Sequence, residues 1–330
     1  MATGYTLTGA ATFTNADPQK VLELIISKGK GVKDHYSFET GVKYKKIIPW
    51  ISNVDVNPST GDNSGYIAGN GSSTVVDVTV ENTPLSIKED YKPQAVQKYV
   101  IGLLAKSSNP EEGLPLIDLI DKLKKDTIHE YNEKFLWTAT TDTSTTVQAF
   151  RSITAGSALS TYDGILEQVK GVAGEYGLKS LSLTNLTDAS VLSYVNSVRL
   201  AMETTTPALI TVDTVMSMSP ANFTAFNKAL YGLKGTINDN TLGADGLPKD
   251  ELVLPGTRTK VISEIGLTGQ NDIFLTYPEN VIAVYDLLDE DEKLDWFYSQ
   301  DAAMWIMRAW YKLGAKVVDP SACFITSYAG

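Results

Sequence analysis

The sequence predicts an α+β fold, and three observations favour this class. Apolar side chains recur at steps of three to five residues between positions 114 and 137, which is typical of one buried face of a long helix. Two β-like runs flank a segment rich in Gly, Asn and Ser at 57–73, which indicates a long hairpin. Helical and strand-like patterns then alternate over 145–280, before a mainly β segment at 281–330.

Composition limits the possible functions. The chain has 330 residues, and 39 acidic against 28 basic side chains give a net charge of −11. This balance argues against a protein that wraps nucleic acid, because a phosphate-binding face is basic. One cysteine and two histidines exclude a disulfide framework and leave little material for a metal or acid–base site. No signal peptide or membrane-length apolar run is present, so we expect synthesis in the cytosol.

Residues 1–50 form an arm-like lead. Asp17 and Pro18 open a short helical pattern whose apolar residues lie within 21–25. Through Lys46 this lead carries seven lysines and four acids, a net charge of +3 in a protein of −11. Two interpretations stay open: a solvated basic segment, or an arm that binds an acidic neighbour such as another copy of the chain.

Residues 51–90 predict a two-stranded excursion with a Gly-rich tip, in which Val76, Val78 and Val80 share one face. A lone hairpin is only marginally stable in water, so we expect this one to lie on something else.

Residues 92–139 predict a short helix at 94–105 and a long amphipathic helix at 114–137. The long helix spans about 36 Å at 1.5 Å per residue.

The remaining elements follow from the same patterns. Residues 145–280 predict helices at 162–174, 187–202 and from Ser219-Pro220, with strands at 180–183, 209–216, 252–267 and 271–277. Residues 302–318 predict a long strand that is apolar on both faces, and we therefore expect neighbours on both sides of it.

A search for catalytic chemistry finds no phosphate loop, dinucleotide fingerprint or HExxH motif. His35 and His129 are interpreted as surface or packing residues, and Cys323 as a small buried hydrophobic residue. The acidic cluster around Asp286–Asp295 lacks EF-hand spacing, so a solvated turn is favoured over a divalent-cation site. We expect no enzyme, no cofactor and no metal.

The order of these parts resembles the major capsid proteins of tailed bacteriophages, which share the Hong Kong ninety-seven fold. At the level of individual residues the resemblance covers about 205–330. It lies in the segments ITVDTVMSMSPANFTAFNKAL, LPGTRTKVISEIGLTGQNDIFLTYPENVIAVYDLL and DEKLDWFYSQDAAMWIMRAWYKLGAKVVDPSACFITS. It implies an N-terminal arm, an extended loop, a peripheral domain with a spine helix and an axial domain. The implied ranges are 1–50 for the arm, 51–90 for the loop, 91–144 with 280–316 for the peripheral domain, and 145–279 with 317–330 for the axial domain.

The resemblance implies a structural protein that assembles through pentamers and hexamers into an icosahedral shell around double-stranded DNA. The expected location is the virion, after assembly in the host cytoplasm without a membrane. The expected partners are other copies and separate scaffolding, portal and auxiliary proteins, because the arm begins almost at Met1. The candidate self-assembly residues are Lys43, Lys45, Lys46, Trp50, Tyr66, Ile67, Asp289, Glu290 and Asp291.

Some family members crosslink a lysine of the extended loop to an asparagine of a neighbour. Residues 51–87 contain no lysine, so we predict no such crosslink. Two alternatives stay open: an encapsulin-like compartment that holds cargo enzymes, and an intracellular α+β enzyme with a carboxylate site near Asp286–Asp301.

Overall fold

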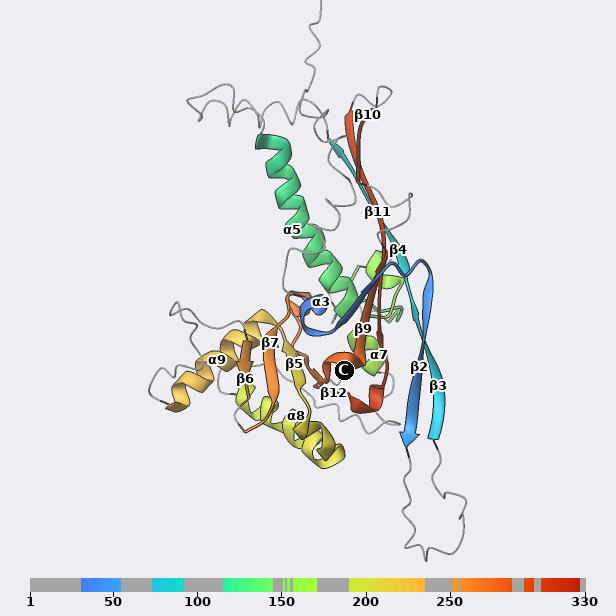
Figure 1. The fold of residues 1–330 in the computed structure, drawn as a ribbon. Coiled ribbons are helices and arrows are strands. Elements are labelled where there is room, and N and C mark those ends of the chain that lie inside the picture. The colour runs from blue at the N-terminus through green and yellow to red at the C-terminus, as the bar shows by residue number, and fades with distance from the viewer. Residues whose placement is uncertain are drawn as a thin grey trace, which may run out of the picture.

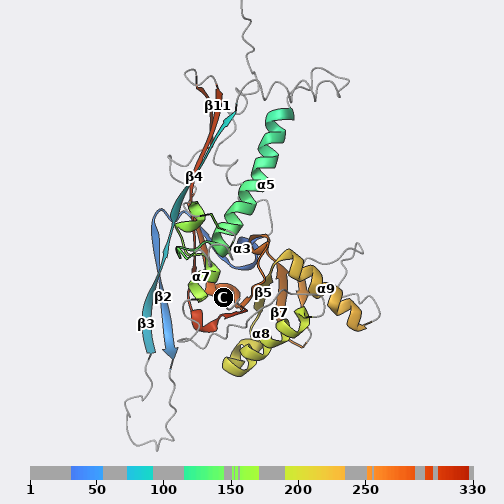
Figure 2. The same ribbon diagram turned by 180° about the vertical axis from the view of Figure 1, so that it is seen from behind.

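A computed structural model describes most of the chain. The described residues are 31–54, 73–91, 115–144, 151, 153–154, 157–170, 190–234, 251–254, 256–286, 294–299 and 304–326. The expected helices at 17–26 and 94–105, the expected strand at 180–183 and most of the acidic turn lie outside these ranges. Figure 1 shows two sheet-containing regions, a long helix and a projecting hairpin, and Figure 2 shows the same arrangement from behind.

The first sheet is built on β11 (Met304–Val317). Its order is β1 (Ser37–Thr40), β9 (Val281–Asp286), β11 and β10 (Leu294–Ser299), and β4 (Thr83–Tyr91) also pairs with β11. β9 and β10 pair with successive parts of β11, and β4 pairs with Trp305–Leu313. This strand is therefore neighboured on both sides, as its apolar faces predict.

Helix α5 (Pro115–Thr138) runs beside the long ribbon of β4, β10 and β11 (Figures 1 and 2). Proline at its first position is favourable, because the missing N–H has no partner within the helix there. Its last turn, over residues 135–138, is buried. The Phe135 ring stacks on Tyr162 at 5.0 Å, and the Trp137 ring meets Tyr36 and Phe274 edge-on at 5.9 and 5.6 Å.

The second sheet has the order β12 (Phe324–Ile325), β8 (Ile273–Thr276), β5 (Thr214–Met218), β7 (Thr259–Ser263) and β6 (Glu251–Val253). Helices α8 (Val191–Thr205) and α9 (Pro220–Lys234) bury apolar side chains against it. Ser219 precedes α9 as predicted, and its hydroxyl oxygen accepts a hydrogen bond from the Asn222 N–H at 3.3 Å.

The hairpin of β2 (Lys45–Val54) and β3 (Ser73–Glu81) forms a separate two-stranded sheet. It projects from the end of the molecule opposite to β10 (Figure 1). At about 3.3 Å per residue, the ten residues of β2 extend about 33 Å. The predicted two-stranded hairpin is therefore present, although its first strand starts at Lys45 rather than at residue 51.

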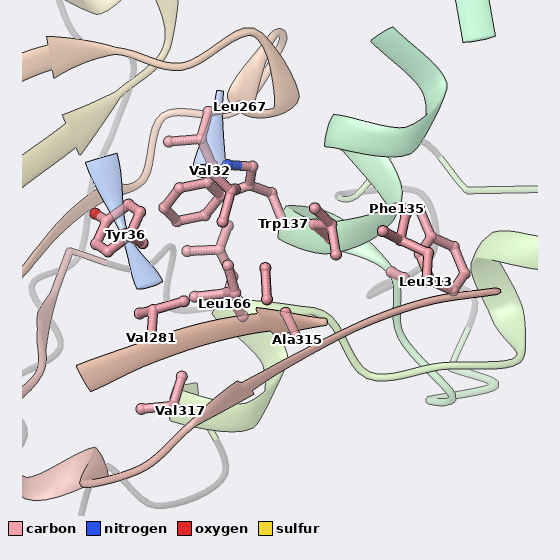
Figure 3. Close-up of a cluster of buried hydrophobic side chains, with 14 of the residues drawn as sticks. Val32, Tyr36, Phe135, Trp137, Leu166, Leu267, Val281, Leu313, Ala315 and Val317 are labelled. Carbon is pink, nitrogen blue, oxygen red and sulfur yellow. The ribbon is translucent and has the colours of Figure 1, made fainter. Parts of the chain in front are cut away.

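The central core lies where α5, the first sheet and the second sheet meet. Figure 3 shows Val32, Tyr36, Trp137 and Leu267 pointing toward one another in this cluster, although they come from α3, the residue after it, α5 and the 3₁₀ turn Ile265–Leu267. Helix α7 (Ile165–Lys170) contributes Leu166 from another side. Because these side chains are almost fully buried, the two sheet-containing regions share one apolar junction.

Several boundaries differ from the sequence-based expectations. Residues 31–40 of the expected arm pack into the core, because Val32 of α3 (Val32–His35) and the following Tyr36 are buried and β1 pairs in parallel with β9. Residues 83–91 leave the hairpin and pair with β11. The expected strand 209–216 begins instead as a 3₁₀ turn at Pro207–Thr211, which proline at its start favours, and β5 follows it. Helix α8 starts at Val191, later than the expected cap at Thr187, which lies outside the described residues.

Candidate self-assembly surfaces

The hairpin has two different faces. Residues directly opposite each other in an antiparallel pair lie on the same face, so Ile48 and Val78 share one face, as do Trp50 and Val76. This inner face packs through Ile48, Trp50 and Val78 against a small cluster that contains fully buried Val80 and Val284. The hairpin is thus attached to its own chain by one side only.

The outer face of the hairpin is apolar and exposed. It consists of Ile47, Pro49, Ile51 and Val75, with polar or charged neighbours at Lys45, Asp77, Thr79 and Glu81. Ile47, Ile51 and Val75 are 54%, 55% and 62% exposed. A strand pair with apolar residues on both faces is typical of a sheet that is covered on both sides. The outer face therefore lacks a cover in the single chain.

The base of the hairpin is fixed over the first sheet. The Asn82 N–H donates to the Tyr44 carbonyl oxygen at 3.0 Å, and the Asn82 side chain donates to the Val42 carbonyl oxygen. The Tyr44 ring lies 5.0 Å from the Lys312 ammonium, which also donates to Asp286 Oδ2 at 3.4 Å. Asp286 is fully buried, so it is not part of a solvated acidic turn as expected.

β11 passes close beneath the hairpin base. A Cβ atom on Gly314 would lie 2.1 Å from the Glu81 carbonyl oxygen. Only glycine allows this approach, because no side chain can occupy that space. The direction in which the hairpin leaves the body is thus fixed by backbone packing.

The predicted basic candidates have different surroundings. Lys43 lies just before β2 and Lys45 is its first residue, and both side chains are exposed. Lys46 instead forms an ion pair with Glu39 of its own chain. Trp50 lies on the inner face, against its own chain. Tyr66, Ile67, Asp289, Glu290 and Asp291 lie outside the described residues.

The sequence analysis did not single out Ile47, Ile51 or Val75. The available signal was the second alternation along β2 and β3, in opposite phase to Val76, Val78 and Val80. Apolar residues in both phases indicate a strand pair that is covered on both faces. These three residues are better candidates for an assembly contact than Trp50.

The single cysteine, Cys323, lies in the protein interior. Cys323 is fully buried, and its Sγ accepts a hydrogen bond from Asn280 Nδ2 at 3.1 Å. Burial raises the pKa of this thiol to about 12, so the reactive thiolate is suppressed at neutral pH. The prediction of a buried small hydrophobic residue is confirmed.

Two further properties concern only the part of the chain that the structure describes. Its helices include none that is long and apolar enough to cross a membrane. Its His, Cys, Asp and Glu side chains form no group of three that could hold a metal ion.

Comparison with known proteins gives fold likeness without sequence likeness. No protein-family model and no curated protein matches the sequence. A chain from the capsid of the native GTA particle matches with a TM-score of 0.53 at 12% identity, over 91% of this chain and 90% of that one. A chain from the satellite phage P4 procapsid including the size determination (Sid) protein matches with a TM-score of 0.52 at 12% identity, over 99% and 92%.

A third match is the virus-like particle from Pyrococcus furiosus, with a TM-score of 0.50 at 10% identity, over 93% of this chain and 96% of that one. At these identities the likeness shows the fold. The chain therefore has the mixed α+β Hong Kong ninety-seven fold of capsid proteins, as the sequence resemblance implied, whereas the arm, the spine helix and the domain ranges stay predictions.

Proposed function

We propose that this protein is a major capsid protein that assembles with copies of itself into a closed shell around double-stranded DNA. The observation that carries the proposal is the outer face of the hairpin, where exposed Ile47, Ile51 and Val75 lie on an element that reaches away from the body. Identical copies arranged head to tail can each place this face on the next one. Such contacts generate rings when the rotation closes.

The parts of the fold take their proposed roles from this arrangement. The β2–β3 hairpin is the extended loop, and α5 is the spine helix of a peripheral domain that includes the first sheet. The second sheet with α8 and α9 is the axial domain, whose tip surrounds the axis of the ring. Residues 31–42 connect the arm to the hairpin. Lys43 and Lys45 enlarge the contact that the hairpin makes with a neighbouring copy.

The charge distribution suits a container for a polyanion. Residues 1–46 carry +3, so the remaining residues carry −14. A basic inner surface would hold DNA through counterion release, whereas an acidic shell leaves the packaged DNA free to exit. We therefore propose enclosure of DNA without sequence-specific binding, in a virion assembled in the host cytoplasm with separate scaffolding and portal proteins.

A cargo-holding compartment is the second candidate. It is favoured by the likeness to the virus-like particle from Pyrococcus furiosus, which covers 93% of this chain. The fold is the same in both candidates, so only the contents distinguish them.

Electron microscopy of the purified protein, with nuclease treatment of the same sample, tests the proposal. Uniform closed shells with nuclease-protected DNA in virions support a capsid protein. Shells that contain only protein cargo support the compartment. A monomer or dimer under all assembly conditions contradicts both.

A further inference from the structure

Two glutamates lie buried together at the junction of three elements. Glu133 belongs to the C-terminal half of α5, and Glu264 lies between β7 and the 3₁₀ turn η4 (Ile265–Leu267). Glu133 is 5% exposed, and Glu264 is not exposed at all. A Cβ atom on Gly266 would lie 2.4 Å from the Glu133 carbonyl oxygen, so η4 is in direct backbone contact with α5.

The segment before the hairpin closes over the same pair. The Val32 N–H donates to Glu133 Oε2 at 3.2 Å, and a Cβ atom on Gly31 would lie 2.2 Å from Glu133 Oε1. The Glu133 carboxyl group therefore contacts the start of α3 directly. Val32, Tyr36, Trp137 and Leu267 form the apolar side of this junction (Figure 3).

The charged and titratable groups around the pair are few. From α3 and its flank, Lys33 and Asp34 act on Glu133, and Asp34 and Tyr36 interact with Glu264. From α5, the Trp137 indole lies near Glu264 without forming a hydrogen bond of normal geometry, and His129 lies buried one turn before Glu133. Neither carboxylate oxygen of Glu264 has a hydrogen-bond partner among the described residues.

Two carboxylates in this setting do not both remain ionised. Burial, and then the charge of Glu133, raises the pKa of Glu264 well above its ordinary range. Burial is also the main cause that raises the pKa of Glu133 to about 7, against the lowering effect of the Val32 N–H. The pair therefore holds protons at pH values where exposed glutamates have lost them.

We propose that Glu133 and Glu264 form a proton-binding latch, in which bound protons hold residues 31–40 against α5 and η4, and loss of protons weakens this attachment. The segment 31–40 leads directly into Lys45 and the hairpin, so the latch couples proton binding to the position of the hairpin base. This inference does not depend on the contents of any shell.

The sign of the effect follows from the raised pKa values. Below the ordinary glutamate pKa, both glutamates are protonated in the attached and in the detached state of residues 31–40. The attachment therefore has its full stability there. It weakens as the pH rises toward and through about 7, because the attached state keeps protons that the detached state releases. An isolated surface ion pair would give no such steep dependence.

Hydrogen exchange of the full-length protein tests the latch. After correction for the intrinsic pH dependence of exchange, amides of residues 31–40 should lose protection between about pH 5 and 7, by up to about tenfold per pH unit for each proton released. Amides of α8, which lies well apart from α3 in Figures 1 and 2, serve as the internal reference and should keep their protection. Equal slopes in the two segments of the wild-type protein would overturn the proposal.

Substitution identifies the groups responsible. The double variant Glu133→Gln/Glu264→Gln keeps the shape of both side chains and removes both titratable carboxyl groups. The pH dependence of amide protection in residues 31–40 should therefore disappear. The matched control Glu130→Gln/Glu279→Gln changes two exposed glutamates and should keep it. An unchanged slope in the first variant, or a lost slope in the control, would contradict the latch. If the first variant does not fold, the wild-type comparison still decides.

Discussion

The outer face of the hairpin provides the sharpest test of assembly. Ile47 and Ile51 are 54% and 55% exposed, so docking onto a neighbour removes about half of each side chain from water. Full burial of an isoleucine side chain contributes about 1.5–3 kcal/mol, so half-burial contributes about 1 kcal/mol. The variant Ile47→Asn/Ile51→Asn should therefore lose about 2 kcal/mol per contact, roughly a 30-fold weaker association.

The assay is sedimentation velocity of each variant over a range of protein concentrations. The lowest concentration that yields shells should rise by roughly 30-fold, whereas the thermal midpoint of the unassembled chain should hardly change, because both positions face solvent there. The control Leu200→Asn replaces a side chain that is 58% exposed on α8, away from the hairpin. Assembly of the hairpin variant at the wild-type concentration, or an equal loss in the control, would refute the role of this face.

Three further predictions concern other parts of the molecule. Gly266→Ala should lower stability by about 1–3 kcal/mol, because its Cβ would overlap the Glu133 carbonyl oxygen of α5; urea denaturation measures this, and a stability within 0.5 kcal/mol of wild type would be inconsistent with the packing. Cys323 should react with a thiol reagent at pH 8 only as fast as the chain unfolds, because burial raises its thiol pKa to about 12; rapid labelling of the native protein would contradict this. Lys45→Glu should reduce shell yield, and added salt should reduce the difference from wild type; a salt-independent difference would exclude an electrostatic contact.

The local elements could be predicted from sequence where one pattern extends over many residues. The long helix was expected at 114–137 and lies at Pro115–Thr138, because its apolar spacing continues over six turns. The long strand was expected at 302–318 and lies at Met304–Val317. The hairpin followed from a Gly-rich tip between two alternating runs.

Other features depend on tertiary contacts that no local pattern encodes. β1 has four residues, and its parallel partner β9 lies far along the chain, so residues 31–40 resembled part of a free arm. The sequence analysis did not single out Glu133, because only the folded chain brings Glu264 beside it. The exposed outer face of the hairpin could have been found from its second alternation, but its lack of a cover is visible only in the structure.

If copies of this chain assemble as proposed, each copy covers the outer face of a neighbour's hairpin. Cryo-electron microscopy of the purified, assembled protein tests it most directly. We expect a closed icosahedral shell in which Ile47, Ile51 and Val75 of each copy are buried against an adjacent copy. A shell in which these side chains remain exposed to solvent, or a protein that forms no shell, would contradict it.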